Sequence, residues 1–285
     1  MIKIESSKIN EICSQYVTYI ISRPRRIKSN IYLQYLFDSE RMHSIISCPA
    51  DKLKDFILDF EKHFPETDPL EWKSFQTYMI NQYKLVRNEY LPHVLDQLDL
   101  SVCPYCNRHY IYTVNKGKKV GAQFDHFYSK SKYPYLALSF YNLIPCCPSC
   151  NKTKGDDEIN INPYIEGFNS ECIIQIDNPV NSILGNEEWT IELVGNERMA
   201  SNITTFALNE LYKHHRDVAQ EIVYKSIANS DGFLSCLKTE FRHLGVDDDF
   251  IHRIIWGIYG NEHEMCKRPL SKMTLDIIKQ MKGLH

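Results

Sequence analysis

The sequence predicts a mainly helical protein with a small α+β segment in its middle. Apolar residues recur at helical spacing in both flanks, and the pattern changes to short strand-like runs after Ser101. With 285 residues, 43% of them hydrophobic and 24% charged, the chain can bury a sizeable core. These values exclude a protein that is disordered throughout.

The N-terminal region predicts helices that stop at prolines or begin at capping residues. We expect helices at about 9–20, 29–47 and 51–64, the first ended by Pro24 and the last by Pro65. Asp68 followed by Pro69 predicts the start of another helix. Pro92 kinks or breaks that helix, and the helical pattern then continues to Leu98.

The middle of the chain predicts short strands and one short helix. Strand composition is found at 108–114 and 120–127, with a turn at 115–119, and an apolar run at 135–144 precedes a helix at 148–154. Two more strand-like runs occupy 172–177 and 189–194, and the remainder is helical, with apolar stripes at Leu211, Val218, Ile222 and Ile227 and at Phe250, Ile254, Ile255 and Ile258. We therefore expect three regions: helical 1–98, a core at 99–168, and mostly helical 169–285, packed on the core.

Charge and cysteine are concentrated in this middle segment. Residues 101–155 hold eight Lys or Arg and one acid, Asp125, so their net charge is +7, while the whole chain carries −3 and the rest therefore −10. Five of the ten cysteines also lie there: Cys103, Cys106, Cys146, Cys147 and Cys150. We expect the chemistry of the protein in this segment.

The N-terminus lacks the pattern of a secretory signal, and no run of 18 apolar residues occurs. We therefore expect a cytoplasmic protein with no membrane segment, in which cysteines are reduced thiols or metal ligands. The unpaired Cys13, Cys48, Cys172, Cys236 and Cys266 are most simply packed thiols.

Two CxxC pairs, Cys103 with Cys106 and Cys147 with Cys150, are separated by 40 residues. Two such pairs supply the four thiolates of a closed tetrahedral Zn²⁺ site, which predicts a structural zinc. The alternatives are a redox CxxC or buried free thiols, but a redox pair normally stands alone beside a βαβ unit. Cys146 adjoins Cys147 without the x₂ spacing, and we interpret it as a core residue or a spare thiol.

Between and after the two pairs lie Asp125-His126, Asn142 and Asn151. This pattern, CPYC…DHF…YNLIPCCPSCNKTKGD, resembles the HNH nucleases and their ββα-metal motif over roughly residues 101–164. Within that family, the stretch that begins at Asp125 is similar to HNH effectors of bacterial anti-phage systems, the Septu and retron-associated PtuB-like nucleases. Ser129 stands where proline is usual in that group.

The resemblance implies roles for these residues in phosphodiester hydrolysis. His126 would be the general base, and Asn142 would hold the His126 loop or ring in place. Asp125 and Asn151 would offer oxygen ligands to a catalytic Mg²⁺ or Mn²⁺. Four lysines would contact nucleic-acid phosphates: Lys130, Lys132, Lys152 and Lys154.

The predicted function is a metal-dependent endonuclease that cuts DNA as an anti-phage effector, with an ABC/SMC-like ATPase as protein partner implied by the PtuB resemblance. One alternative is RNA cleavage, for example of tRNA, because a water nucleophile does not need the 2′-hydroxyl. Another is a zinc-knuckle module that binds nucleic acid without catalysis. A second basic cluster, Arg23, Arg25, Arg26 and Lys28, is interpreted as a solvated loop or a contact to the nucleic-acid backbone.

Overall fold

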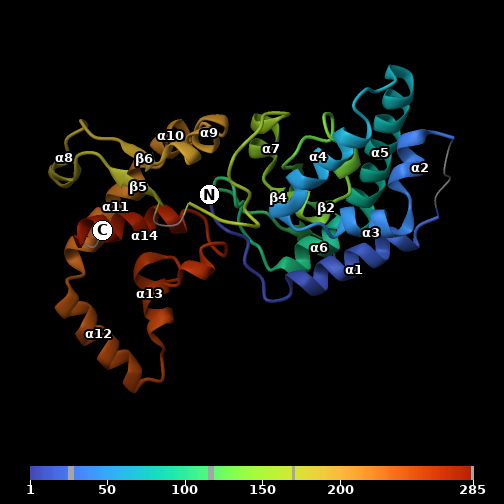
Figure 1. Cartoon of the computed structure of the whole chain (residues 1–285). Coiled ribbons are helices and arrows are strands. Elements are labelled where there is room, and N and C mark those ends of the chain that lie inside the picture. The colour runs from blue at the N-terminus through green and yellow to red at the C-terminus, as the bar shows by residue number, and fades with distance from the viewer. Residues whose placement is uncertain (25–28, 115–118, 169–170, 284–285) are drawn as a thin grey trace. The chain divides into compact units, whose positions relative to one another are not determined.

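The structure is a computed structural model that describes residues 1–24, 29–114, 119–168 and 171–283 (Figure 1). These residues are mostly helical and include short strands, as the sequence predicted. Three members of the second basic cluster, Arg25, Arg26 and Lys28, and most of the expected turn at 115–119 lie outside the described residues.

The N-terminal helices follow the predicted order. Their bounds are α1 Ile9–Ser22, α2 Ile31–Leu36, α3 Ser39–Ile46, the 3₁₀ turn η1 Ala50–Lys52, α4 Leu53–His63, α5 Pro69–Glu89 and α6 Leu91–Leu98. The predicted start at Asp68 is confirmed, because its carboxylate accepts hydrogen bonds from the backbone N–H groups of Leu70 and Glu71 at 3.0 and 2.8 Å. The break near Pro92 is also confirmed, since this residue lies in the first turn of α6.

The single helix expected at 29–47 is wrong: the structure has α2 and α3 there, with a break between them. Asp38 takes an extended ψ of 133° and caps α3, accepting a hydrogen bond from the backbone N–H of Arg41 at 3.2 Å. A short Asp that bonds the backbone ahead of it favours a new helix start over continuation of the helix behind it.

Aromatic residues form the core beneath these helices. Tyr32 of α2, Phe60 of α4 and Phe75 of α5 pack together, and the ring of Tyr135 stacks on Phe60 with centroids 3.9 Å apart. The N-terminal helices therefore share a core with the segment that carries the predicted site.

The middle segment is less regular than the sequence predicted. It contains β1 Thr113–Val114, β2 Lys119–Val120, β3 Gln123–His126, the 3₁₀ turns η2 Pro134–Leu136 and η3 Phe140–Asn142, β4 Leu143–Cys146 and α7 Pro148–Lys154. The strand expected at 108–114 is confined to its last two residues and a bridge at Tyr110, and the strand expected at 120–127 is interrupted at Gly121. There the Gly121 backbone N–H donates to Tyr112 O at 2.9 Å, which turns the chain between β2 and β3.

The C-terminal part contains both expected strands and a series of helices. Its elements are β5 Cys172–Ile176, α8 Pro179–Leu184, β6 Ile191–Gly195, α9 Glu197–Thr205, α10 Leu208–Lys213, α11 Arg216–Ala228, α12 Asp231–His243, α13 Asp248–Trp256, the 3₁₀ turn η5 Glu262–Glu264 and α14 Ser271–Met281. Two predicted stripes differ from the structure: Leu211 and Val218 lie on separate helices, and Phe250 and Ile254 are exposed. Helix α13, which contacts α11 and α12, buries Ile251 and Trp256 instead.

The chain divides into two compact units. One comprises 1–3, 101–110 and 166–285, and the other comprises 4–100 and 111–165. The division into 1–98, 99–168 and 169–285 stays a prediction. Among the described residues, each strand pairs with one antiparallel neighbour, β1 with β2, β3 with β4 and β5 with β6. In the same residues no helix has the length and apolar character needed to cross a bilayer.

Candidate functional site

The antiparallel ribbon of β3 and β4, followed directly by helix α7, positions most of the predicted site residues. Asp125 pairs with Ile144 and His126 pairs with Leu143, and the loop 127–142 connects the two strands. Side chains alternate along a strand, so Gln123 and Asp125 share one face of β3 while Phe124 and His126 share the other. Helix α7 packs on the first of these faces, where Lys154 contacts Asp125 and Asn151 contacts Gln123.

Two backbone carbonyls of β3 accept no hydrogen bond from β4. Phe127 N donates to Asn142 O at 2.9 Å, which marks 127 and 142 as a hydrogen-bonded pair. Pairs in an antiparallel ladder alternate between bonded and non-bonded, so the carbonyls of Phe124 and His126 point away from β4. Side chains satisfy both: Tyr83 Oη donates to Phe124 O at 2.8 Å, and Lys154 Nζ donates to His126 O at 2.8 Å.

Asp125 and Lys154 form a buried ion pair. The Lys154 Nζ lies 3.3 Å from Asp125 Oδ2, and the two residues are 1% and 3% exposed. This placement contradicts the expectation that Lys154 contacts nucleic-acid phosphates, because its ammonium is enclosed and already bonded to Asp125 and to the His126 carbonyl. A lysine at the end of a helix is normally solvated, and only the packing of α7 on β3 encloses this one.

His126 is held in one tautomer. Its Nε2 lies 3.1 Å from Ala137 O, while Nδ1 is buried and has no hydrogen-bond partner. A carbonyl can only accept, so the neutral ring carries its proton at Nε2 and the lone pair at Nδ1. Burial lowers the pKa of His126 to about 3, and the nearby Lys130 acts in the same direction, so the imidazole is neutral near pH 7.

Asn142 holds the start of the loop that follows His126. Its Oδ1 accepts from Tyr128 N at 2.8 Å, and its Nδ2 donates to Tyr128 O at 3.1 Å and Leu136 O at 3.0 Å. The residue is fully buried. Three hydrogen bonds from this one side chain hold the loop that follows His126.

Asn151 lies on α7, three residues before Lys154, so both side chains point toward the same face of β3. The Asn151 Nδ2 donates to Gln123 Oε1 at 2.5 Å. This bond leaves Oδ1 as the oxygen that Asn151 can offer to another group.

The remaining lysines differ in their surroundings. Lys152 is exposed on α7, and Lys132 is exposed and paired with Glu158 at 3.1 Å. Lys130 is largely enclosed: its Nζ lies 5.7 Å from the centroid of the Tyr83 ring, and burial lowers its pKa. Of the four lysines expected to contact phosphates, only Lys132 and Lys152 are exposed.

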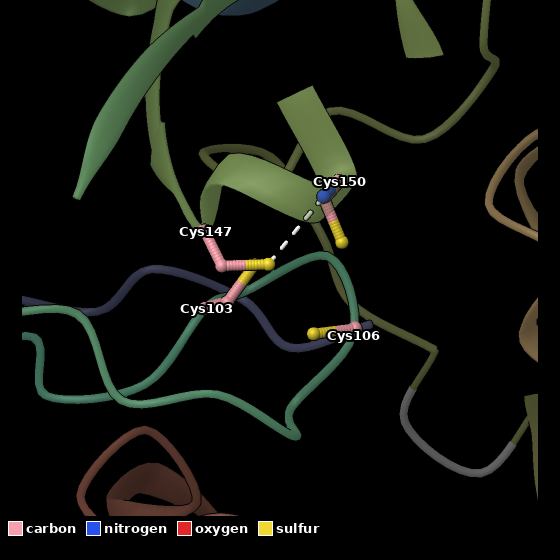
Figure 2. A group of neighbouring side chains, drawn as sticks. All are labelled: Cys103, Cys106, Cys147 and Cys150. Atoms are coloured by element: carbon pink, nitrogen blue, oxygen red, sulfur yellow. Dashed lines mark hydrogen bonds between the residues drawn. The ribbon is translucent and has the colours of Figure 1, made fainter. Parts of the chain in front are cut away.

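The four cysteines of the CxxC pairs come together (Figure 2). The sulfur atoms of Cys103, Cys106, Cys147 and Cys150 lie within 4.8 Å of one another, and all four residues are buried. Cys147 caps helix α7, and its Sγ accepts a hydrogen bond from Cys150 N at 3.5 Å. This cluster could bind zinc, and its members are those that the x₂ spacing selected.

Cys146 is not part of that cluster. It is the last residue of β4, is buried and pairs with Gln123. Among the described residues, the sulfur group therefore contains Cys147 rather than its neighbour.

Comparison with protein families adds one decisive observation. Residues 103–157 match the family model described as HNH endonuclease. This segment is therefore an HNH endonuclease domain, whose family points to nuclease activity, a nucleic-acid substrate and the use of divalent metal ions. Neither the curated proteins nor the solved structures contain a match to the chain.

The donor set in the HNH domain fits a hard divalent cation. Asp125 offers a carboxylate and Asn151 an amide oxygen, both toward the interface of β3 and α7. Oxygen donors of this kind suit Mg²⁺ or Mn²⁺. The buried Nδ1 of His126, on the opposite face of β3, has no hydrogen-bond partner.

Sequence reasoning missed three residues around this site. Gln123 orients Asn151, the carboxylate of Asp156 accepts a hydrogen bond from Ser129 Oγ in the loop after His126, and Tyr83 contacts Phe124 and His126 from helix α5. The alternation along β3 could have placed Gln123 beside Asp125. Tyr83 gave no signal, because it lies 43 residues before His126 and looks like one more apolar position of a helix.

Proposed function

We propose that this protein is a metal-dependent endonuclease that hydrolyses phosphodiester bonds, with the HNH domain as its catalytic part. The observation that carries the proposal is the state of His126. Its ring is anchored through Nε2 to Ala137 O, its Nδ1 is without a partner, and it follows Asp125 directly in β3. A general base needs this combination of a fixed tautomer and an unoccupied lone pair.

In this proposal each site residue has one task. His126 Nδ1 accepts the proton of the attacking water, and Asn142 keeps the loop beside it in place through its three hydrogen bonds. Asp125 and Asn151 hold Mg²⁺ or Mn²⁺. When bound, such an ion stabilises charge on the phosphate and on the leaving oxygen. Lys152 and Lys132, both exposed, contact flanking phosphates in this proposal.

The cysteine cluster has a structural task in the same proposal. Four thiolates at close range are the ligand set of a closed, tetrahedral zinc site with no open position for substrate. Zn²⁺ bound to Cys103, Cys106, Cys147 and Cys150 would fix the start of α7, and with it Asn151 and Lys154. Two metals with separate functions are therefore expected in each chain.

We propose DNA as the substrate and defence against phage as the setting, since the sequence between Asp125 and Gly155 is similar to the PtuB-like effectors. The same resemblance supports an ABC/SMC-like ATPase as a protein partner. RNA cleavage, and binding without cleavage, are outcomes that the experiment below separates.

The test compares the wild type with His126→Ala and with a matched control, His109→Ala, an exposed histidine inside the HNH segment. Each purified full-length chain is incubated with plasmid DNA or tRNA and with Mg²⁺, Mn²⁺ or EDTA. We expect metal-dependent cleavage by the wild type and the control, and a loss of about 10²- to 10⁴-fold in His126→Ala. Cleavage of tRNA without cleavage of plasmid DNA would show that the substrate is RNA.

The proposal is wrong if His126→Ala cleaves as fast as the control. If the wild type retains a full complement of zinc and binds nucleic acid without cutting it under any of these conditions, even with the ATPase added, the protein is a binding module.

A further inference from the structure

Helix α5 reaches the HNH domain through Tyr83. This residue lies outside the segment 103–157 that matches the HNH family. It is buried, at 5% exposed, on the face of α5 that also carries Phe75, Met79 and Val86. Two of its contacts, rather than its burial, distinguish it from the other residues of that face.

The first contact is to the backbone of β3. The Tyr83 hydroxyl donates to Phe124 O at 2.8 Å, one of the two carbonyls that the ladder leaves open. Its partner across the ribbon is Pro145, at a non-hydrogen-bonded position of the ladder, so β4 offers this carbonyl no donor. Tyr83 therefore anchors the strand two residues before His126.

The second contact is to the ring of His126 itself. The two ring centroids are 4.4 Å apart at an interplanar angle of 72°, an edge-to-face arrangement. The imidazole is also anchored by the hydrogen bond between its Nε2 and Ala137 O. A single hydrogen bond allows an imidazole ring to rotate about that bond. Packing against the Tyr83 ring restricts this rotation and so fixes the direction in which Nδ1 points.

We propose that Tyr83 is a positioning residue for His126, so that the nuclease site extends beyond the HNH segment to helix α5. This inference rests on the proposed function, because it gives His126 the role of base. Tyr83 touches neither substrate nor metal. It holds the strand that carries His126 through its hydroxyl, and the imidazole through its ring.

The test uses four variants of the full chain. Tyr83→Leu removes the ring and the hydroxyl. Tyr83→Met also removes both but fills more of the space with a flexible side chain. Tyr83→Phe keeps the ring and removes only the hydroxyl. Phe75→Leu is the matched control: it is a buried aromatic of the same helix that packs against Tyr32, Phe60 and Trp72 rather than His126.

Two readouts are taken. Cleavage kinetics give kcat and KM, and NMR of the chain with ¹⁵N-labelled histidine reports whether His126 keeps a single Nε2–H tautomer. We expect Tyr83→Leu and Tyr83→Met to lower kcat by about a hundredfold with KM little changed. In both variants the ¹⁵N signals of His126 should show a mixture of the two tautomers instead of one. Tyr83→Phe should recover most of kcat and the single tautomer, and Phe75→Leu should resemble the wild type in both readouts.

Equal losses of kcat in Phe75→Leu and in the folded Tyr83 variants, with an unchanged His126 signal, would overturn the inference. The failure of the proposed function looks different. If the proposed function is wrong, His126→Ala cleaves like the wild type, or no variant cleaves at all, whatever residue occupies position 83. The NMR readout does not depend on cleavage, so a fixed ring in Tyr83→Leu refutes the positioning role in either case.

Discussion

The ammonium of Lys154 lies 3.3 Å from the carboxylate of Asp125, and neither group is open to solvent. The same Nζ donates to the carbonyl of His126. One side chain of α7 therefore contacts both residues of the Asp-His pair, and this pair is held to the helix that begins at the cysteine cluster. We therefore expect a substitution of Lys154 to affect the structure around Asp125 and His126 rather than a contact with the substrate.

Replacing Lys154 with Met should destabilise the protein, because it leaves the Asp125 carboxylate buried without its partner. Removing one member of a buried ion pair costs about 3 kcal/mol in the free energy of unfolding. Chemical denaturation measures this value. Lys152→Met, two residues earlier on the same helix but exposed, is the control and should change stability by less than about 0.5 kcal/mol.

Nucleic-acid affinity should respond in the opposite order. Lys152→Met should weaken binding and reduce its dependence on salt, since one phosphate contact is lost. Lys154→Met, measured at a temperature at which it is folded, should bind with the affinity of the wild type. Weaker binding by Lys154→Met than by Lys152→Met would show that the buried ammonium reaches phosphate after all.

Replacing Cys103 or Cys147 with Ala should remove bound zinc, because three thiolates do not complete the closed site. Metal analysis should find one zinc per chain in the wild type and far less in either variant, together with a lower melting temperature. Cys146→Ala is the control next to Cys147, and it should keep its zinc. Loss of zinc from Cys146→Ala alone would mean that Cys146, rather than Cys147, is the ligand.

Replacing Asn142 with Leu should loosen the loop after His126. Three backbone groups, Tyr128 N, Tyr128 O and Leu136 O, lose their partner in a buried place, at a total cost of about 3 kcal/mol. Hydrogen exchange should show faster exchange of the Tyr128 amide in this variant. The exposed Asn88→Ala serves as a control. Protection of Tyr128 equal to that of the wild type would contradict the proposed role of Asn142.

Local signals in the sequence predicted the parts of the fold that depend on neighbouring residues. The Asp68–Pro69 start of α5, the helix at 148–154 and the x₂ spacing of the cysteines are all of this kind, and the structure agrees with each. The burial of Lys154 and the contact of Tyr83 with His126 depend on packing between distant segments. The prediction that Phe250 and Ile254 belong to a buried stripe was wrong for the same reason. Periodicity identifies an apolar face of a helix but does not show whether another element covers that face.

Thiol reactivity should separate the packed cysteines from the exposed one. Burial raises the pKa of Cys13 and of Cys48 to about 11, and Cys236 is exposed. Only the thiolate is alkylated, and a thiol with this raised pKa is protonated at pH 8, so these two cysteines should react about a hundredfold more slowly than an ordinary thiol. Raising the pH from 8 to 10 should therefore continue to speed the alkylation of Cys13 and Cys48 in the folded chain. Peptide mapping by mass spectrometry after timed alkylation measures each site, and Cys236→Ser identifies the fast component. Fast labelling of Cys13 or Cys48 in the folded chain at pH 8 would show that these side chains are not packed as the structure places them.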